Sequence, residues 1–169
     1  LYEQIRGREG TRQTKPSTES FFSLPLLKTK LYIPAAPAGR VIRSVLIDRL
    51  RKVEQKALTI ISAPAGFGKT TLLAEWIGQT PLPVAWLSLD NGDNDPYRFL
   101  SYLISALESI DEDIGVEARQ IMQAPHLAPP HILLASLMND LSKLTRSFVL
   151  VLDDYQFITE HAVHETLAY

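Results

Sequence analysis

The stretch SAPAGFGKTTLL, residues 62–73, decides the fold of this chain. Its second glycine is followed directly by Lys69 and Thr70. The apolar run ALTIIS at 57–62 precedes the glycines and an amphipathic pattern follows them, so the expected order is strand, turn and helix. In that order, successive backbone N–H groups converge on a phosphate at the N-terminus of the helix. The stretch therefore predicts a phosphate-binding loop, or P-loop.

Each residue type in the loop suits contact with a nucleotide. Gly66 and Gly68 can adopt positive φ and let the backbone approach a phosphate closely. Lys69 would neutralise the β and γ phosphates of ATP, and the Thr70 hydroxyl would ligate Mg²⁺. The predicted nucleotide-binding residues, for ATP or ADP, are Ala63, Pro64, Ala65, Gly66, Phe67, Gly68, Lys69, Thr70 and Thr71.

The general P-loop pattern has a glycine at the position of Ala63. Pro64 follows and favours an extended conformation in the residue before it, which alanine adopts without strain. The substitution therefore weakens the match to the pattern more than it weakens the physical case for phosphate binding.

A later apolar run, FVLVLDDY at 148–155, ends in two carboxylates. Asp153 at the end of such a strand is the expected Walker B partner of the loop and would hold Mg²⁺ together with Thr70. Asp154 would polarise an attacking water as general base, or would only support the site without a catalytic duty. The predicted catalytic residues are thus Lys69 and Asp154. An ordinary turn with a capping pair of acids is the structural alternative.

Strands and helices alternate along the chain. Apolar runs predict strands at 57–62, 84–89 and 148–155, and helical spacing predicts helices at 45–53, 70–79, 96–107 and 129–145. The first of these helices is expected to bury Val45, Leu46, Leu50 and Val53. The alternation predicts an α/β fold, a P-loop NTPase with a parallel sheet and flanking helices. We expect a disordered polar arm at 1–22, a strap and helix at 23–56, and the P-loop ATPase domain at 57–169.

Several other residues have structural interpretations. Asp95 is expected to cap the helix that begins at Pro96, and Asp90 and Asp93 to form the preceding turn. His161 and His164 are three residues apart but lack a third metal ligand, so surface or packing roles are expected. Trp76, Trp86 and Tyr97 are expected in the core.

Composition limits the class of protein. Lys and Arg number 17 against 19 Asp and Glu, so no global basic field favours nucleic acid or an anionic membrane. There is no cysteine, which suits a reducing compartment. No apolar run approaches the roughly 20 residues of a membrane-spanning helix. These features predict a cytoplasmic protein that does not contact a membrane.

The quoted motifs resemble a known family. The chain resembles the N-terminal ATPase module of large ATP-binding bacterial transcription regulators of the LuxR type. The resemblance is carried by the stretch at 58–107, with its WLSLD block and DNDP turn, by LVLDDYQFI at 150–158 and by VHETL at 163–167. The resemblance covers about residues 27–169, and Ala63 is in keeping with it.

The resemblance implies a STAND-class, AAA-like P-loop ATPase that acts as a switch. ADP would favour a closed form, and ATP with an inducer an open form that self-associates in the full-length protein. DNA would be bound through a C-terminal helix-turn-helix that is not present in this chain. Two other functions stay open: the ATPase module of a serine/threonine protein kinase or a freestanding AAA-like ATPase, and a degenerate pseudo-ATPase scaffold.

The chain departs from the family in three ways. Arg43-Ser44-Val45-Leu46 replaces an Arg-Pro-Arg-Leu segment, and Gln156 stands where a histidine often follows Asp-Asp-Tyr. The chain is also expected to be truncated at its C-terminus, before a strand that would insert between the first strand and the Walker B strand. We therefore expect the 169 residues alone to be poorly stable and to hydrolyse ATP inefficiently.

Overall fold

The computed structural model describes residues 26–35, 43–52 and 56–168. The predicted polar arm at 1–22 lies outside the described residues, and so does Val53. None of the helices in these ranges is long and apolar enough to cross a membrane.

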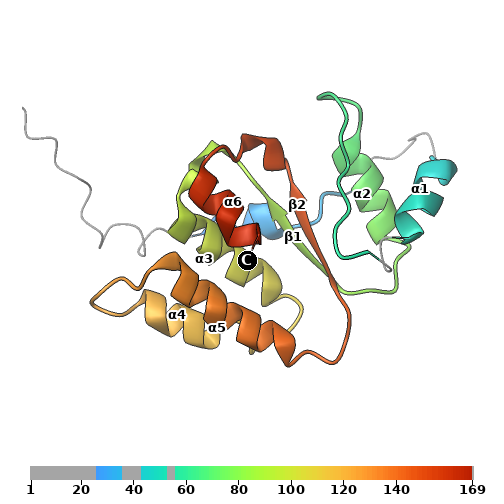
Figure 1. The fold of residues 1–169 in the computed structure, drawn as a ribbon. Coiled ribbons are helices and arrows are strands. Elements are labelled where there is room, and N and C mark those ends of the chain that lie inside the picture. The colour runs from blue at the N-terminus through green and yellow to red at the C-terminus, as the bar shows by residue number, and fades with distance from the viewer. Residues whose placement is uncertain (1–25, 36–42, 53–55, 169) are drawn as a thin grey trace, which may run out of the picture.

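Two parallel strands form the centre of the molecule. β1 (Val84–Ser88) pairs with β2 (Val149–Asp153) so that Val84 lies opposite Val149 and Ser88 opposite Asp153. Figure 1 shows α1 and α2 to one side of this pair and α3 to α6 on the other. The described residues thus have the predicted α/β arrangement with a small parallel sheet, which is compatible with a P-loop-like domain.

Four helices build the larger core. They are α3 (Pro96–Leu107), α4 (Val116–Met122), α5 (Pro130–Ser142) and α6 (His161–Ala168). Their buried side chains pack with those of β1, and the core includes Ala85, Leu87, Phe99, Leu100, Leu103, Ile104, Leu107, Leu133, Leu137 and Val163. The predicted start of α3 is confirmed, because the Asp95 carboxylate accepts a hydrogen bond of 2.8 Å from the Arg98 N–H and Pro96 is the first helical residue.

The sequence reasoning missed α4. The helix follows Gly115, whose φ of 81° is in the left-handed region and whose N–H donates to the Asp140 carboxylate at 3.0 Å. Only seven residues long, α4 is stabilised by packing on α5 rather than by a long apolar stripe of its own. Short helices of this kind give little periodic signal in a sequence.

A second, smaller core joins α1 (Ser44–Leu50) to α2 (Lys69–Ile77). It contains Ile47, Leu50, Leu72 and Trp76, with Val149 packed against it. The expectation that α1 buries Val45 was wrong, because its side chain is 67% exposed. The buried face of the helix is set by Ile47 and Leu50, which are three residues apart and therefore adjacent on one face.

The strand predicted at 57–62 is absent: the structure has no regular secondary structure from 58 to 64. Leu58 and Ile60 are 77% and 79% exposed, and only Ile61 of the run packs against the smaller core. An apolar run becomes a strand only when a neighbouring strand takes its backbone hydrogen bonds. Within the described residues β2 pairs with β1 alone, so this run has no such neighbour.

The predicted extended strap also contains a helical turn. η2, a 3-10 helix at Lys28–Leu31, lies beside β1. The two other 3-10 turns that matter below are η4 (Asn91–Asn94), which follows β1, and η5 (Tyr155–Phe157), which follows β2. β1 ends one residue before the predicted end at Leu89. β2 ends two residues before the predicted end at Tyr155.

Candidate nucleotide site

The backbone of the glycine-bearing loop has the conformation that its residues predict. Gly66 and Gly68 have φ of 80° and 74°, values that side chains rarely allow. The Phe67 N–H bonds to the Pro64 carbonyl at 3.3 Å, which closes the turn, and Gly68 is the N-cap of α2. A methyl group at Gly66 would meet no atom within 4 Å, so the loop is open on that side.

Lys69 folds back over the start of the loop. Its Nζ donates to the Ala63 carbonyl at 2.9 Å and lies 3.5 Å from the Pro64 carbonyl. Ala63 therefore contributes its main-chain oxygen to this contact. Because every residue type supplies a carbonyl, this contact does not require glycine at position 63.

The structure brings together the two predicted Mg²⁺ ligands, although 83 positions separate them in sequence. The Thr70 hydroxyl donates to the Asp153 carboxylate at 2.7 Å. Asp153 is buried, with 5% of its surface exposed, and its position at the end of β2 places it beside the start of α2. A hydroxyl and a carboxylate are the oxygen ligands that Mg²⁺ prefers.

Asp154 has an unusual backbone conformation. It is the one non-glycine residue with positive φ in the described part of the chain, at 58°. Its carboxylate accepts a hydrogen bond of 2.7 Å from the Gln156 amide. A non-glycine residue held at positive φ costs about 1–3 kcal/mol of folding free energy, and such residues cluster at functional sites. The turn that Asp154 makes redirects the chain from β2 into η5.

Arg43 is a further cation at the loop, to which the sequence reasoning gave no role of its own. Its Nη1 donates to the Phe67 carbonyl at 2.8 Å, and a methyl group at Gly68 would lie 3.2 Å from its Nη2. Two positive side chains, Arg43 and Lys69, thus contact the loop backbone. The contact spans 24 positions, and a sequence pattern carries no signal for it.

The two histidines of α6 have separate partners. His161 is exposed and pairs with Glu165 at 3.4 Å, whereas His164 Nδ1 lies 2.5 Å from the Tyr155 hydroxyl. Burial raises the pKa of the Tyr155 hydroxyl. The described residues contain no group of three or more His, Cys, Asp or Glu side chains that could hold a metal ion. His164 therefore helps to attach α6 to the turn after β2.

No protein-family model matches the chain. Curated relatives do: it is 38% identical over 145 residues to the HTH-type transcriptional regulator MalT of Serratia proteamaculans, and 37% identical over 144 residues to that of Yersinia enterocolitica. The MalT of Vibrio cholerae is 28% identical over 143 residues. Each match covers 85% of this chain and 16% of the relative, so the chain spans about one sixth of the relatives' length. Over most of its own length, the chain is therefore related to a segment of the HTH-type transcriptional regulators named MalT.

Proposed function

We propose that the chain is the ATP-binding regulatory module of a MalT-like transcriptional activator. The observation that carries the proposal is the 2.7 Å contact between Thr70, directly after the loop, and Asp153 at the end of β2. A nucleotide switch needs a phosphate cradle and a cation site side by side. The relatives reported above are named as transcriptional regulators, which favours this function over the kinase-linked and freestanding ATPase alternatives.

The residues present fit ATP with Mg²⁺. Gly66 carries no side chain on the open side of the loop, and the loop is lined by the N–H groups at the start of α2. Within the described residues, the partly buried Lys69 ammonium group bonds main-chain carbonyls of the loop, so it can turn toward a phosphate. Thr70 and Asp153 would hold Mg²⁺, which would neutralise charge on the β and γ phosphates.

The chain's own residues divide the proposed work. The loop binds and orients the phosphates, Lys69 supplies positive charge, and Asp154 would accept a proton from the attacking water. Hydrolysis need not be fast, because a switch requires only that ATP bind one conformation better than the other. Self-association of the ATP-bound protein and DNA contact through a helix-turn-helix belong to the longer protein in this proposal, which places the chain in the cytoplasm.

Thr70→Val tests the cation assignment. The substitution removes the hydroxyl and keeps the shape of the side chain, so ATP affinity measured with Mg²⁺ should fall about tenfold, the loss of one contact worth about 1.4 kcal/mol. Affinity measured in EDTA should change little. Isothermal titration of the protein with ATP, with and without Mg²⁺, measures both values.

Thr145→Val is the matched control, because Thr145 is exposed and lies in the connection between α5 and β2. Its affinity should equal that of the unsubstituted protein in both buffers. If Thr70→Val keeps the full dependence on Mg²⁺, the assignment of Thr70 is wrong. If the unsubstituted protein does not bind ATP at all, the proposed function is wrong.

A further inference from the structure

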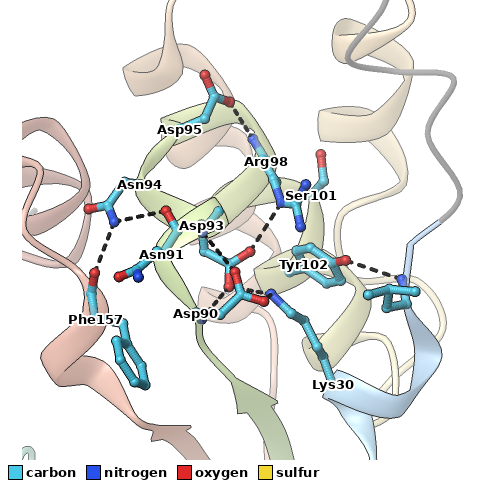
Figure 2. A network of polar contacts seen from close by, with 12 residues as sticks. Lys30, Asp90, Asn91, Asp93, Asn94, Asp95, Arg98, Ser101, Tyr102 and Phe157 are labelled. Atoms are coloured by element: carbon cyan, nitrogen blue, oxygen red, sulfur yellow. Dashed lines mark hydrogen bonds and ion pairs between the residues drawn. The ribbon is translucent and has the colours of Figure 1, made fainter.

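The turn η4 contacts two segments that lie far from it in sequence. Figure 2 shows Lys30 reaching toward Asp90 and Asp93 on one side, while Asn94 points toward Phe157 on the other. The turn is held by its own cap: the Asp90 carboxylate accepts from the Gly92 N–H at 2.7 Å, and the Asp93 carboxylate accepts from the Asp90 N–H at 2.8 Å. These reciprocal bonds make η4 a defined unit rather than a loose loop.

On the first side, η4 anchors the strap segment, defined here as residues 26–35. The Lys30 ammonium group lies 2.5 Å from the Asp93 carboxylate and 2.8 Å from that of Asp90. Lys30 and Asp93 are 7% and 0% exposed, and the same ammonium group lies 4.7 Å from the centre of the Tyr102 ring. Removal of one partner from such a buried pair is strongly destabilising. Lys30 therefore contributes to docking of the strap segment.

Other contacts support this docking. The Leu27 N–H donates to the Tyr102 hydroxyl at 3.1 Å. The hydrogen bond from Lys30 holds the pKa of Asp90 below its usual range, which shows that the ion pair favours the charged carboxylate. Arg98 adds a second cation beside Asp93, at 3.3 Å. The strap segment is thus attached by charge at one point and by its backbone at another.

On the second side, η4 holds the segment that follows the β2 carboxylates. The Asn94 amide nitrogen donates to the Phe157 carbonyl at 2.9 Å. Its amide oxygen accepts from the Thr159 N–H at 2.7 Å and from the Glu160 N–H at 2.9 Å. One side chain thereby fixes the backbone between η5 and α6.

This segment is joined closely to the candidate site. The Phe157 N–H donates to the Asp154 carbonyl at 3.0 Å, and Asp154 directly follows Asp153. The Asp153 carbonyl in turn accepts from the Leu89 N–H at 3.0 Å, one residue before the cap of η4. An ion pair, hydrogen bonds and the backbone of η4 therefore connect the strap segment to the turn at Asp154.

We propose that η4 is a coupling junction, through which docking of the strap segment and binding of nucleotide are linked. This inference rests on the proposed nucleotide function. Docking of the strap segment holds the segment after Asp154 in place. ATP binding then loses less conformational entropy, so the affinity for ATP is higher. Because linkage is reciprocal, bound ATP strengthens docking of the strap segment by the same factor. The strap is then a regulatory element of the switch.

The test is a double-mutant cycle on ATP affinity in Mg²⁺. Lys30→Met undocks the strap segment, and Asn94→Ala cuts the contact to the post-β2 segment. Each should weaken ATP binding about fivefold, the lower end of typical coupling between sites. Because both substitutions break one series of contacts, the double variant should be no weaker than either single variant.

Matched controls lie two residues from Lys30 and three residues from Asn94. Lys28 is an exposed lysine of η2, and Asn91 is an exposed asparagine of η4 whose carbonyl, not its side chain, meets Asn94. Lys28→Met and Asn91→Ala should bind ATP as the unsubstituted protein does. The proposed coupling would be wrong if Lys30→Met and Lys28→Met bound ATP with equal affinity. It would also be wrong if the losses of ATP affinity in Lys30→Met and Asn94→Ala multiplied in the double variant.

Amide hydrogen exchange keeps the proposal testable if Lys30→Met does not fold. ATP with Mg²⁺ should slow exchange at the Leu27 and Lys30 amides about fivefold in the unsubstituted protein and leave it unchanged in Asn94→Ala. Unchanged exchange in the unsubstituted protein, despite ATP binding, would overturn the junction alone. Absence of ATP binding would overturn both the junction and the proposed function.

Discussion

Lys69→Met is expected to weaken ATP binding about a hundredfold, equivalent to about 2.7 kcal/mol. A charge-assisted contact with a phosphate is worth more than a neutral hydrogen bond, and methionine keeps the length of the side chain without its charge. Among the residues that the structure describes, the Lys69 ammonium group bonds the Ala63 and Pro64 carbonyls and no side chain, so its loss breaks no side-chain network there. Isothermal titration calorimetry with ATP, in the presence of Mg²⁺, measures the affinity of the variant for ATP.

Thermal unfolding of the same variant separates binding from stability. The melting temperature of Lys69→Met should lie close to that of the unsubstituted protein, because the lost contacts are at a partly exposed loop. Lys28→Met removes an exposed lysine of η2 and should retain full affinity. Unchanged affinity in Lys69→Met would show that the loop does not hold the nucleotide, which would contradict the proposed function and favour the pseudo-ATPase scaffold.

Features that depend on local chemistry could be predicted from the sequence. Gly66 and Gly68 adopt the left-handed φ that their lack of a side chain allows, and Asp95 caps α3. Trp76 and Trp86 lie in the core, with 2% and 1% exposed. In each case the residue type alone narrows the conformations or environments that the position can take.

The meeting of Thr70 with Asp153 was also predictable, for a different reason. In P-loop NTPases, the hydroxyl after the loop lysine and the aspartate at the end of the Walker B strand bind the same Mg²⁺, so the two motifs are expected to meet. The contact spans 83 positions, yet it follows from two motifs that are each recognisable alone. A pair of motifs with a known spatial relationship therefore carries long-range information.

Other features depend on neighbours that the sequence does not identify. The run at 57–62 has the composition of a strand, but a strand also needs a paired backbone. The contacts of Lys30 with Asp93 and of Asn94 with Phe157 each span 63 positions and join residues that read as ordinary surface side chains. Only the folded structure shows that both pairs meet at η4.

Gly115→Ala is expected to destabilise the protein by about 2–4 kcal/mol, the sum of two effects. A methyl group there would lie 2.5 Å from Cγ2 of Ile104, which is 1% exposed and has no room to move. Alanine would also be held at a φ of 81°. The loss should appear as a lower midpoint in urea unfolding, followed by circular dichroism.

Gly78→Ala is the control, because its φ is −65° and a methyl group would lie 3.6 Å or more from its neighbours. It should change stability by less than about 1 kcal/mol. Acid conditions add a further check. Hydrogen bonds from the Lys143 side chain and from the Gly115 N–H hold the pKa of Asp140 below its usual range. The contacts of the charged Asp140 carboxylate therefore stabilise the folded protein above about pH 4, and this stabilisation is lost as the pH falls. The free energy of unfolding of the unsubstituted protein should therefore fall as the pH drops below about 4. Equal stability of Gly115→Ala and the unsubstituted protein at neutral pH would show that α3 and α4 are not packed through Gly115 and Ile104.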